Sequence, residues 1–306
     1  MNPDIVVAML AISVSRATPL VLGGLSGVIS ERAGVVNIAI EGIMLARAFA
    51  GFLVGIYTHS LPLAVLGAIL TGGVMAALHA VLSIRFSVDQ IISGTVINIL
   101  AVGLTGYFNR QLFQSGAPPG QAVFQDIKIP FLGDIPMIGR ILFEHKLITF
   151  SAIALVLVVH VLLFHTPWGL RTRAVGEHPL AADTVGINVL RTRYVNVILA
   201  GLLAGLGGAY FTLESVPHFE PMMTNGRGFI ALAAMIFGKW RPFPVWGAAI
   251  LFGVAEALPV TLQIQGINVP FQIVGLLPYV LTIVVLAGVI GRATPPAALG
   301  TAYAKR

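Results

Sequence analysis

Long runs of apolar residues follow one another along nearly the whole chain, separated by short polar stretches. A helix needs about 20 mostly apolar residues to cross a bilayer, and lipid offers no water to satisfy exposed backbone groups. Of the 306 residues, 57% are hydrophobic and only 10% are charged, unlike the composition of soluble domains. The sequence therefore predicts an all-α polytopic membrane protein, with one transmembrane domain over residues 1–306.

We predict a bundle of about nine transmembrane helices, with eight to ten as the range and some of them broken. The first run is expected to be retained, because Asp4 and the absence of Lys or Arg before Arg16 do not fit a cleavable signal peptide. The seventh run is too short to span alone and is predicted to be a half-helix. The nine runs are 5–29, 37–57, 61–84, 91–113, 147–165, 194–214, 227–238, 243–262 and 271–290.

The distribution of Lys and Arg predicts the orientation in the cell membrane. If the segment between the fifth and sixth runs is cytoplasmic, eleven basic residues lie inside and four outside, at or in the 114–146 loop. This agrees with the positive-inside rule. It predicts an extracytoplasmic N-terminus and 114–146 loop and a cytoplasmic C-terminus. Because orientation explains the positive charge, no nucleic-acid partner is expected. The eleven are Arg32, Arg85, Arg171, Arg173, Arg191, Arg193, Lys239, Arg241, Arg292, Lys305 and Arg306.

The chain lacks the residue patterns of several kinds of chemistry. It has no cysteine, and Trp240 follows Gly238-Lys239 where a phosphate-binding loop needs Ser or Thr. The histidines show no close ligand spacing, and "GLSGV" at 24–28 lacks the second half of a GxSxG elbow. We expect no catalytic residue, no metal site and no cofactor on this chain; an intramembrane hydrolase is a weak alternative.

The stretch "TPWGLRTRAVGEHPLAADTVGINVLRTRY", residues 166–194, is polar and basic at both ends. Pro179 suits a first helical turn, and Gly186 suits the position just after a helix. Leu180, Ala181, Ala182 and Val185 would form one small apolar face of this helix. Such a face beside a membrane indicates a docking partner; the alternative is an ordinary solvated loop.

Three segments carry a resemblance to a known family. "RAVGEHPLAADTVGINV" resembles the cytoplasmic coupling loop of ABC-importer permeases. "SERAGVVNIAIEGIML" and "GRGFIALAAMIFGKWRP" are similar to the nucleoside-importing branch, which is related to the ribose and branched-chain amino-acid permeases. The resemblance covers nearly the whole chain, with the segments in the same order.

The resemblance implies a transport subunit that changes no bond itself. Its partners would be an ABC ATPase subunit with two nucleotide-binding modules, a second permease subunit that is a different chain, and an extracytoplasmic substrate-binding lipoprotein. ATP and Mg would bind the partner ATPase. The coupling loop is 166–193, where Glu177 would meet both the helix N-terminus and a basic residue on the ATPase. The positions that match the coupling loop are Arg173, Gly176, Glu177, Pro179, Ala181, Ala182 and Gly186.

Polar residues interrupt the apolar pattern between the first two runs, at Glu31, Arg32, Asn37 and Glu41. Polar groups at bilayer depth usually face a cavity or one another. This polar entry to the second run therefore either lines or gates a substrate path, or Glu41 only fixes helix packing. Both interpretations are open. The candidate path residues are Asn37, Glu41, Arg47, Ser93, Thr95, Asn98, Phe108, Tyr210, Glu214 and Glu256.

Arg47 departs from the family, which more often has a small residue there. A charged side chain at a helix centre costs about 2.5–3.5 kcal/mol on insertion scales, so it should have a partner. Glu41 is six residues away, on a different face of the helix. We therefore expect the partner to be Asp89, Glu214 or Glu256.

Two alternative functions remain at this point. An ABC permease for a simple sugar such as ribose would share the same architecture. An ion-coupled secondary transporter could use Glu41, Arg47 and Glu256 as a relay. The coupling loop argues against the second alternative, because a self-sufficient carrier does not need one.

Overall fold

The computed structural model describes residues 3–113, 120–266, 275–284 and 293–304. Within these ranges, seven helices are long and apolar enough to cross a membrane. Two of them, α3 and α9, continue into short π-helical turns, η1 and η2. The long helices are α1 (Pro3–Arg32), α2 (Ile40–Thr58), α3 (Leu61–Ala80) with η1 (Val81–Arg85), α4 (Gln90–Leu112), α6 (Leu147–His165), α9 (Val189–Tyr210) with η2 (Phe211–Ser215), and α11 (Pro242–Ile264).

Shorter elements connect or flank these helices. β1 and β2 pair antiparallel, with Ile127 opposite His145. The shorter elements are β1 (Ile127–Lys128), α5 (Ile138–Leu142), β2 (Glu144–His145), α7 (Pro167–Glu177), α8 (Pro179–Thr184), α10 (Arg227–Phe237) and α13 (Leu277–Val284).

The all-α polytopic class predicted from the sequence is confirmed, whereas the count of nine is not. The seventh predicted run forms α10, which is short, as expected of a half-helix. The ninth, 271–290, lies partly outside the described residues, which include α13. Most boundaries agree to within three residues, and the largest difference is at the start of the sixth run. The second helix begins at Ile40, after an irregular 33–39 turn, and the sixth begins at Val189, inside the predicted loop.

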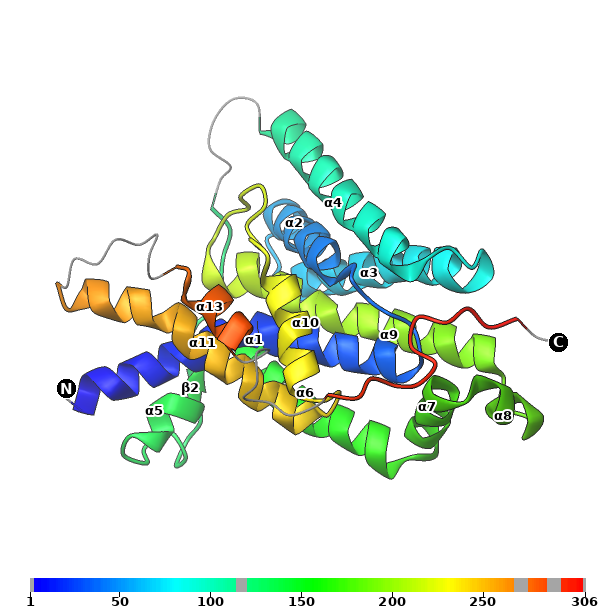
Figure 1. The fold of residues 1–306 in the computed structure, drawn as a ribbon. Helices are drawn as coiled ribbons and strands as arrows, with labels where there is room; N and C mark the ends of the chain where they lie inside the picture. The colour runs from blue at the N-terminus through cyan, green and yellow to red at the C-terminus, as the bar shows by residue number, and fades with distance from the viewer. Residues whose placement is uncertain (1–2, 114–119, 267–274, 285–292, 305–306) are drawn as a thin grey trace.

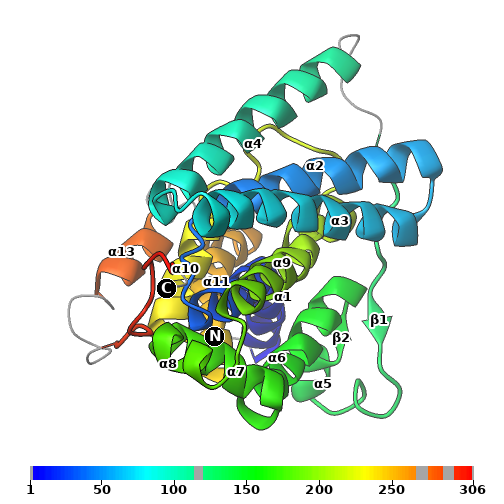
Figure 2. The ribbon, with the colours of Figure 1, turned by 90° about the vertical axis from the view of Figure 1, so that its right-hand side faces the viewer.

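The helices form three layers when viewed from the end that carries α7 and α8 (Figure 2). α2, α3 and α4 lie on one side, α1 and α9 in the middle, and α6 with α7 and α8 on the other. α10 runs across the direction of α1 and α11, and the N-terminus lies at the end opposite α7 and α8 (Figure 1). We call the end with α7, α8 and residues 293–304 the α7–α8 end.

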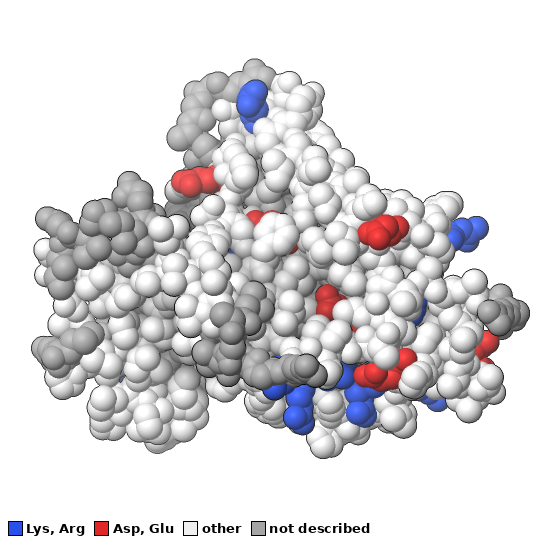
Figure 3. Space-filling view, in the orientation of Figure 1, with Lys and Arg blue, Asp and Glu red and all other residues white. Residues whose placement is uncertain are grey.

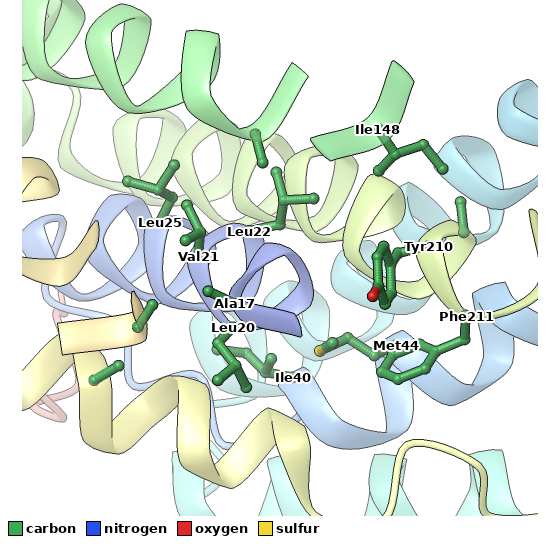
Figure 4. Close-up of a cluster of buried hydrophobic side chains, with 14 of the residues drawn as sticks. Ala17, Leu20, Val21, Leu22, Leu25, Ile40, Met44, Ile148, Tyr210 and Phe211 are labelled. Carbon is green, nitrogen blue, oxygen red and sulfur yellow. The ribbon is translucent and has the colours of Figure 1, made fainter. Parts of the chain in front are cut away.

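The core surrounds α1, whose second half is almost entirely buried. Leu20, Leu22 and Leu25 of α1 pack in one cluster with Met44 of α2 and Tyr210 of α9 (Figure 4). Glycine permits the closest helix crossings. A Cβ on Gly23 would lie 2.8 Å from the Cβ of Ala231 on α10, so any larger residue there would push α10 away from α1.

Candidate functional site: a docking helix and a polar interior

The 166–193 segment contains two helices where one was predicted. Thr166 caps α7 by accepting a hydrogen bond from Gly169 N at 3.2 Å, and Pro167 occupies the first turn. The chain bends at His178 and resumes as α8, the short helix expected at Pro179. Gly186 follows α8 with φ +83°, which suits glycine.

The apolar face expected on α8 divides in two. Ala182 packs inward against Val175 of α7 and Val189 of α9. Leu180 and Val185 point outward, with 58% and 75% of their surface exposed. α8 therefore presents apolar side chains at the surface of the α7–α8 end.

The C-terminal segment 293–304 fastens this end to the bundle. Ala298 N donates to Gly176 O at 2.9 Å, and Gly300 N donates to Gly34 O at 3.2 Å. Arg193 of α9 donates through Nη1 to Thr301 O at 2.8 Å. One segment thus connects α7 and α9 with the turn between α1 and α2.

Glu177 belongs to this fastening. Its Oε2 accepts from Ala297 N at 3.1 Å, and its Oε1 lies 4.0 Å from Nη1 of Arg32. The N-cap of α8 is His178, without a side-chain capping bond. Arg173, also assigned to coupling, stacks its guanidinium 5.1 Å from the ring centre of Phe164.

The polar residues at the end of α1 join distant parts of the chain. Trp240 Nε1 donates to Glu31 Oε2 at 2.6 Å, and Arg32 Nε donates to Trp240 O at 3.1 Å. These bonds hold the turn between α10 and α11 against α1. Glu31 and Arg32 therefore have a structural task at the α7–α8 end.

The irregular 33–39 turn is held by side chains of α3 and α4. His79 Nε2 lies 2.8 Å from Val36 O, and Val36 N donates to Gln90 Oε1 at 2.7 Å. Ser93, a predicted path residue, is buried beside His79, 3.0 Å from its Nδ1. Asn37 is buried, and its side-chain amide has no hydrogen-bond partner in the described residues.

Glu41 at the start of α2 caps α10 across the bundle. Its Oε1 accepts from Thr224 Oγ1 at 2.7 Å and from Gly226 N at 2.8 Å, and its Oε2 accepts from Gly228 N at 2.6 Å. A carboxylate there satisfies free N–H groups and meets the positive end of the α10 dipole. We call this arrangement the Glu41 clasp.

Asn98 of α4 supports the same crossing. Its Oδ1 accepts from Gly42 N at 2.8 Å, and its Nδ2 donates to Ile38 O at 3.0 Å. A Cβ on Gly42 would lie 2.6 Å from Asn98 Cα, so α4 can approach α2 this closely only because residue 42 is glycine.

A cavity of about 340 Å³ lies between α2, α4 and the start of α10. Glu41 and Asn98 line it, but their polar atoms are already bonded as described above. The large side chains on the rest of its wall are apolar, namely Leu45, Ile99, Val102, Met222 and Phe229. A solute here would meet a mostly apolar wall, which favours weak binding.

The other predicted path residues do not join this cavity. Thr95 and Phe108 are exposed on α4. Glu214 is buried between η2 and α6, accepting from Thr149 Oγ1 and, at 2.9 Å, from Ile148 N. Tyr210 is buried in the core, and its hydroxyl oxygen lies 3.2 Å from Oγ of Ser15.

The expectation for Arg47 is wrong. It is fully buried, and none of its three guanidinium nitrogens has a hydrogen-bond partner in the described residues. Asp89 instead caps α4, bonding Ile91 N at 2.9 Å. The guanidinium lies against Gly72 of α3, where a side chain would collide with it. Sequence spacing could not show that all three acids are engaged elsewhere.

Glu256 lies in a second, charged cavity. Its Oε2 is 3.0 Å from Nε of Arg227, the first residue of α10. Arg16 of α1 and Tyr279 of α13 line the same cavity. Arg16 was not among the predicted path residues, although a lone arginine in the first apolar run signals a site of this kind. Within the described ranges, no three His, Asp or Glu side chains are placed to hold a metal ion.

Comparison with known proteins agrees with this architecture. The model of the family described as the branched-chain amino acid transport system / permease component matches residues 9–286. The chain belongs to this permease family. As a member, it is a transport component of an ABC system and not an enzyme, and hydrolysis of ATP takes place on a separate subunit.

Several curated relatives match over most of their length. The chain is 42% identical to the guanosine ABC transporter permease protein NupQ of Bacillus subtilis, covering 94% of each chain. It is 40% identical to the nucleoside ABC transporter permease protein NupC of Lactococcus lactis, again over 94% of each. It is 36% identical to the putative glucose ABC transporter permease protein TsgC13 of Haloferax volcanii, over 91% of this chain and 90% of that one. No solved structure matches.

Proposed function

We propose that this chain is a membrane-spanning permease subunit of an ABC importer that carries nucleosides into the cell. The similarity to two nucleoside permeases over 94% of the chain carries this proposal. The cavity beside the Glu41 clasp supports it, because a path with few free polar groups holds a cargo weakly and releases it.

In this proposal the α7–α8 end faces the cytoplasm and the N-terminus faces outward, following the distribution of basic residues. Leu180 of α8 and Val185, the residue directly after it, contact an ABC ATPase with two nucleotide-binding modules. A second, different permease chain completes the path, and a substrate-binding lipoprotein delivers the cargo from outside. ATP and Mg bind the ATPase and not this chain.

The segment 293–304 gives α8 a route to the interior. It bonds both the end of α7 and Gly34 in the turn that precedes α2. α2 in turn holds α10 through the Glu41 clasp. A displacement of α8 by the ATPase would reach the cavity through these contacts, because packed elements transmit strain.

The test is uptake in cells without their own nucleoside transport. This chain would be expressed with its neighbouring ATPase, permease and binding-protein genes, and entry of labelled guanosine and uridine would be measured. We expect uptake to require this chain. Excess unlabelled nucleoside should suppress the uptake, whereas excess glucose or ribose should not. Suppression by glucose or ribose alone would overturn the nucleoside assignment.

A sugar cargo is the second candidate, favoured by the similarity to the putative glucose permease. The same competition experiment separates the two. The ion-coupled alternative loses its structural basis as well as its family support. Glu41 is bonded to α10 and Glu256 pairs with Arg227. Arg47 makes no hydrogen bond or ion pair with either acid in the described residues, so the three form no relay there.

A further inference from the structure

A groove at the α7–α8 end borders the proposed ATPase contact at Val185, and its other lining residues have no role in the mechanism above. It has a volume of about 660 Å³ and lies between α7, the turn after α8 and the start of α9. Trp168 and Arg171 of α7 form one wall, and Arg191 and Val195 of α9 form the other. The turn residues 185–188 close one side.

The groove is positively charged. Arg171 and Arg191 are the only ionisable residues among the described ones that line it, and both are exposed. Neither guanidinium has a hydrogen bond or ion pair with the described part of the chain. The other polar side chains of the lining bond locally: Asn188 Oδ1 accepts from Arg191 N at 2.9 Å, and Thr192 Oγ1 donates to Asn188 O at 2.8 Å. Two guanidinium groups without a partner in the described residues therefore face the same groove from two helices.

The groove lies at the level where a membrane helix leaves the lipid. α6 has the highest mean hydropathy of the seven long helices in the described residues and ends at His165, three residues before Trp168. Tryptophan is enriched at this interface. On α9, Arg191 is followed at four-residue spacing by Val195 and Leu199, each with 39% of its surface exposed. These residues form one stripe of the helix surface, charged at the groove and apolar beyond it.

We infer that this groove binds an anionic phospholipid. Its phosphate group lies between Arg171 and Arg191, and an acyl chain follows Val195 and Leu199 along α9. Arginine binds phosphate oxygens with two parallel hydrogen bonds, and basic pockets between membrane helices recognise anionic head groups. On the visible face of the molecule, most Lys and Arg also lie toward this end (Figure 3).

The test uses the full chain, purified in detergent and stripped of lipid. Its melting temperature is followed while phosphatidylglycerol, phosphatidylcholine or inorganic phosphate is added. We expect phosphatidylglycerol alone to raise it. In the Arg171→Gln/Arg191→Gln variant the apparent affinity should fall about 30-fold, the effect of two basic residues beside an anionic lipid. Arg85→Gln, which removes an exposed arginine outside the groove, is the control and should behave as wild type.

Other outcomes overturn the inference. Equal stabilisation by inorganic phosphate would indicate a site for a free anion. Equal stabilisation by phosphatidylcholine, or an unchanged response of the double variant, would show that the two arginines do not select the head group. Loss of ATPase co-purification with unchanged lipid binding would assign the groove to a protein partner. If the double variant does not fold, the variants Arg171→Gln and Arg191→Gln are measured separately. Each is expected to bind phosphatidylglycerol about fivefold more weakly than wild type. None of these results depends on the cargo.

Discussion

The α7–α8 end and the interior around the Glu41 clasp use polar residues in opposite ways. In the interior, Glu41 and Asn98 use their polar atoms in hydrogen bonds, mostly to backbone groups of neighbouring segments and, for Glu41, also to the Thr224 hydroxyl. At the α7–α8 end, Arg171 and Arg191 are exposed and have no ion-pair partner in the described residues. Leu180 and Val185 are exposed as well. The polar groups of the interior hold the fold together, whereas this end exposes charged and apolar side chains at its surface. Substitutions in the interior should therefore lower stability, whereas substitutions at the α7–α8 end should impair binding with little loss of stability.

The largest loss of stability is expected from Glu41→Ala. The change leaves Gly226 N, Gly228 N and the Thr224 hydroxyl without their acceptor. We expect the free energy of unfolding to fall by about 3 kcal/mol or more, since each hydrogen bond to a charged group contributes about 1.5–3 kcal/mol. Uptake should be lost as well. Thermal unfolding in detergent and the uptake assay measure both effects.

Glu41→Gln is the matched control, because it keeps an acceptor oxygen at nearly the same place. Its loss of stability should be clearly smaller. Wild-type stability and uptake in Glu41→Ala would show that the clasp does not hold α10 and would remove the contrast between the two regions.

Arg47→Met should change stability in the other direction. The substitution replaces a buried cation that has no partner in the described residues by an apolar side chain of similar length. Relief of the insertion cost predicts a gain of about 2 kcal/mol, seen as a higher melting temperature. A large loss of stability would instead reveal an anionic or carbonyl partner for Arg47 in the assembled membrane protein. Arg85→Met, at an exposed position, serves as the comparison.

Glu177→Ala should have a small effect on stability and a local effect on dynamics. Its side chain is 44% exposed, so its contacts with Ala297 N and Arg32 contribute about 1 kcal/mol or less. Hydrogen exchange should accelerate at residues 296–301. Glu177→Lys, which adds a fourth cation to the cluster of Arg32, Arg173 and Arg241 around Phe164, should also impair transport while inserting normally in the membrane. Unchanged exchange and uptake in both variants would exclude a role for Glu177 in fastening this end.

The smallest change in stability is expected for Leu180→Ser combined with Val185→Ser. Both side chains are exposed, so unfolding should shift by less than about 0.5 kcal/mol per site. Co-purification of the ATPase should nevertheless be lost. Ala182→Leu, which overfills the buried side of α8, is the opposite control: it should destabilise the α7–α8 end itself. Retention of the ATPase by the double serine variant would place the docking surface elsewhere.

Much of the architecture could be predicted from the sequence, because long apolar runs have few solutions in lipid. α6 was predicted at its observed bounds, and α10 was recognised as too short to span. The helix at Pro179 and the glycine after it were also predicted, since local chemistry decides both. α7 was missed because its polar, basic sequence lacks an apolar period.

The site residues were harder to predict, because their partners are distant in the chain. Glu41 was singled out as polar in an apolar setting, but its partners near Gly226 are about 185 residues away. The acids predicted to pair with Arg47, namely Asp89, Glu214 and Glu256, all bond to other groups. Arg16 was overlooked, although it lines the charged cavity with Glu256.

The sequence by itself determined that this protein folds in lipid, that it is helical, and where α8 begins. Each depends on residues close together in the chain, through length, hydropathy and capping. Only the tertiary structure decided which polar side chains are hydrogen-bonded within the fold and which have no partner in the described residues. Hydrogen bonds such as those of Glu41 and Asn98 depend on which helices cross, and that choice follows from the packing of the whole bundle around α1.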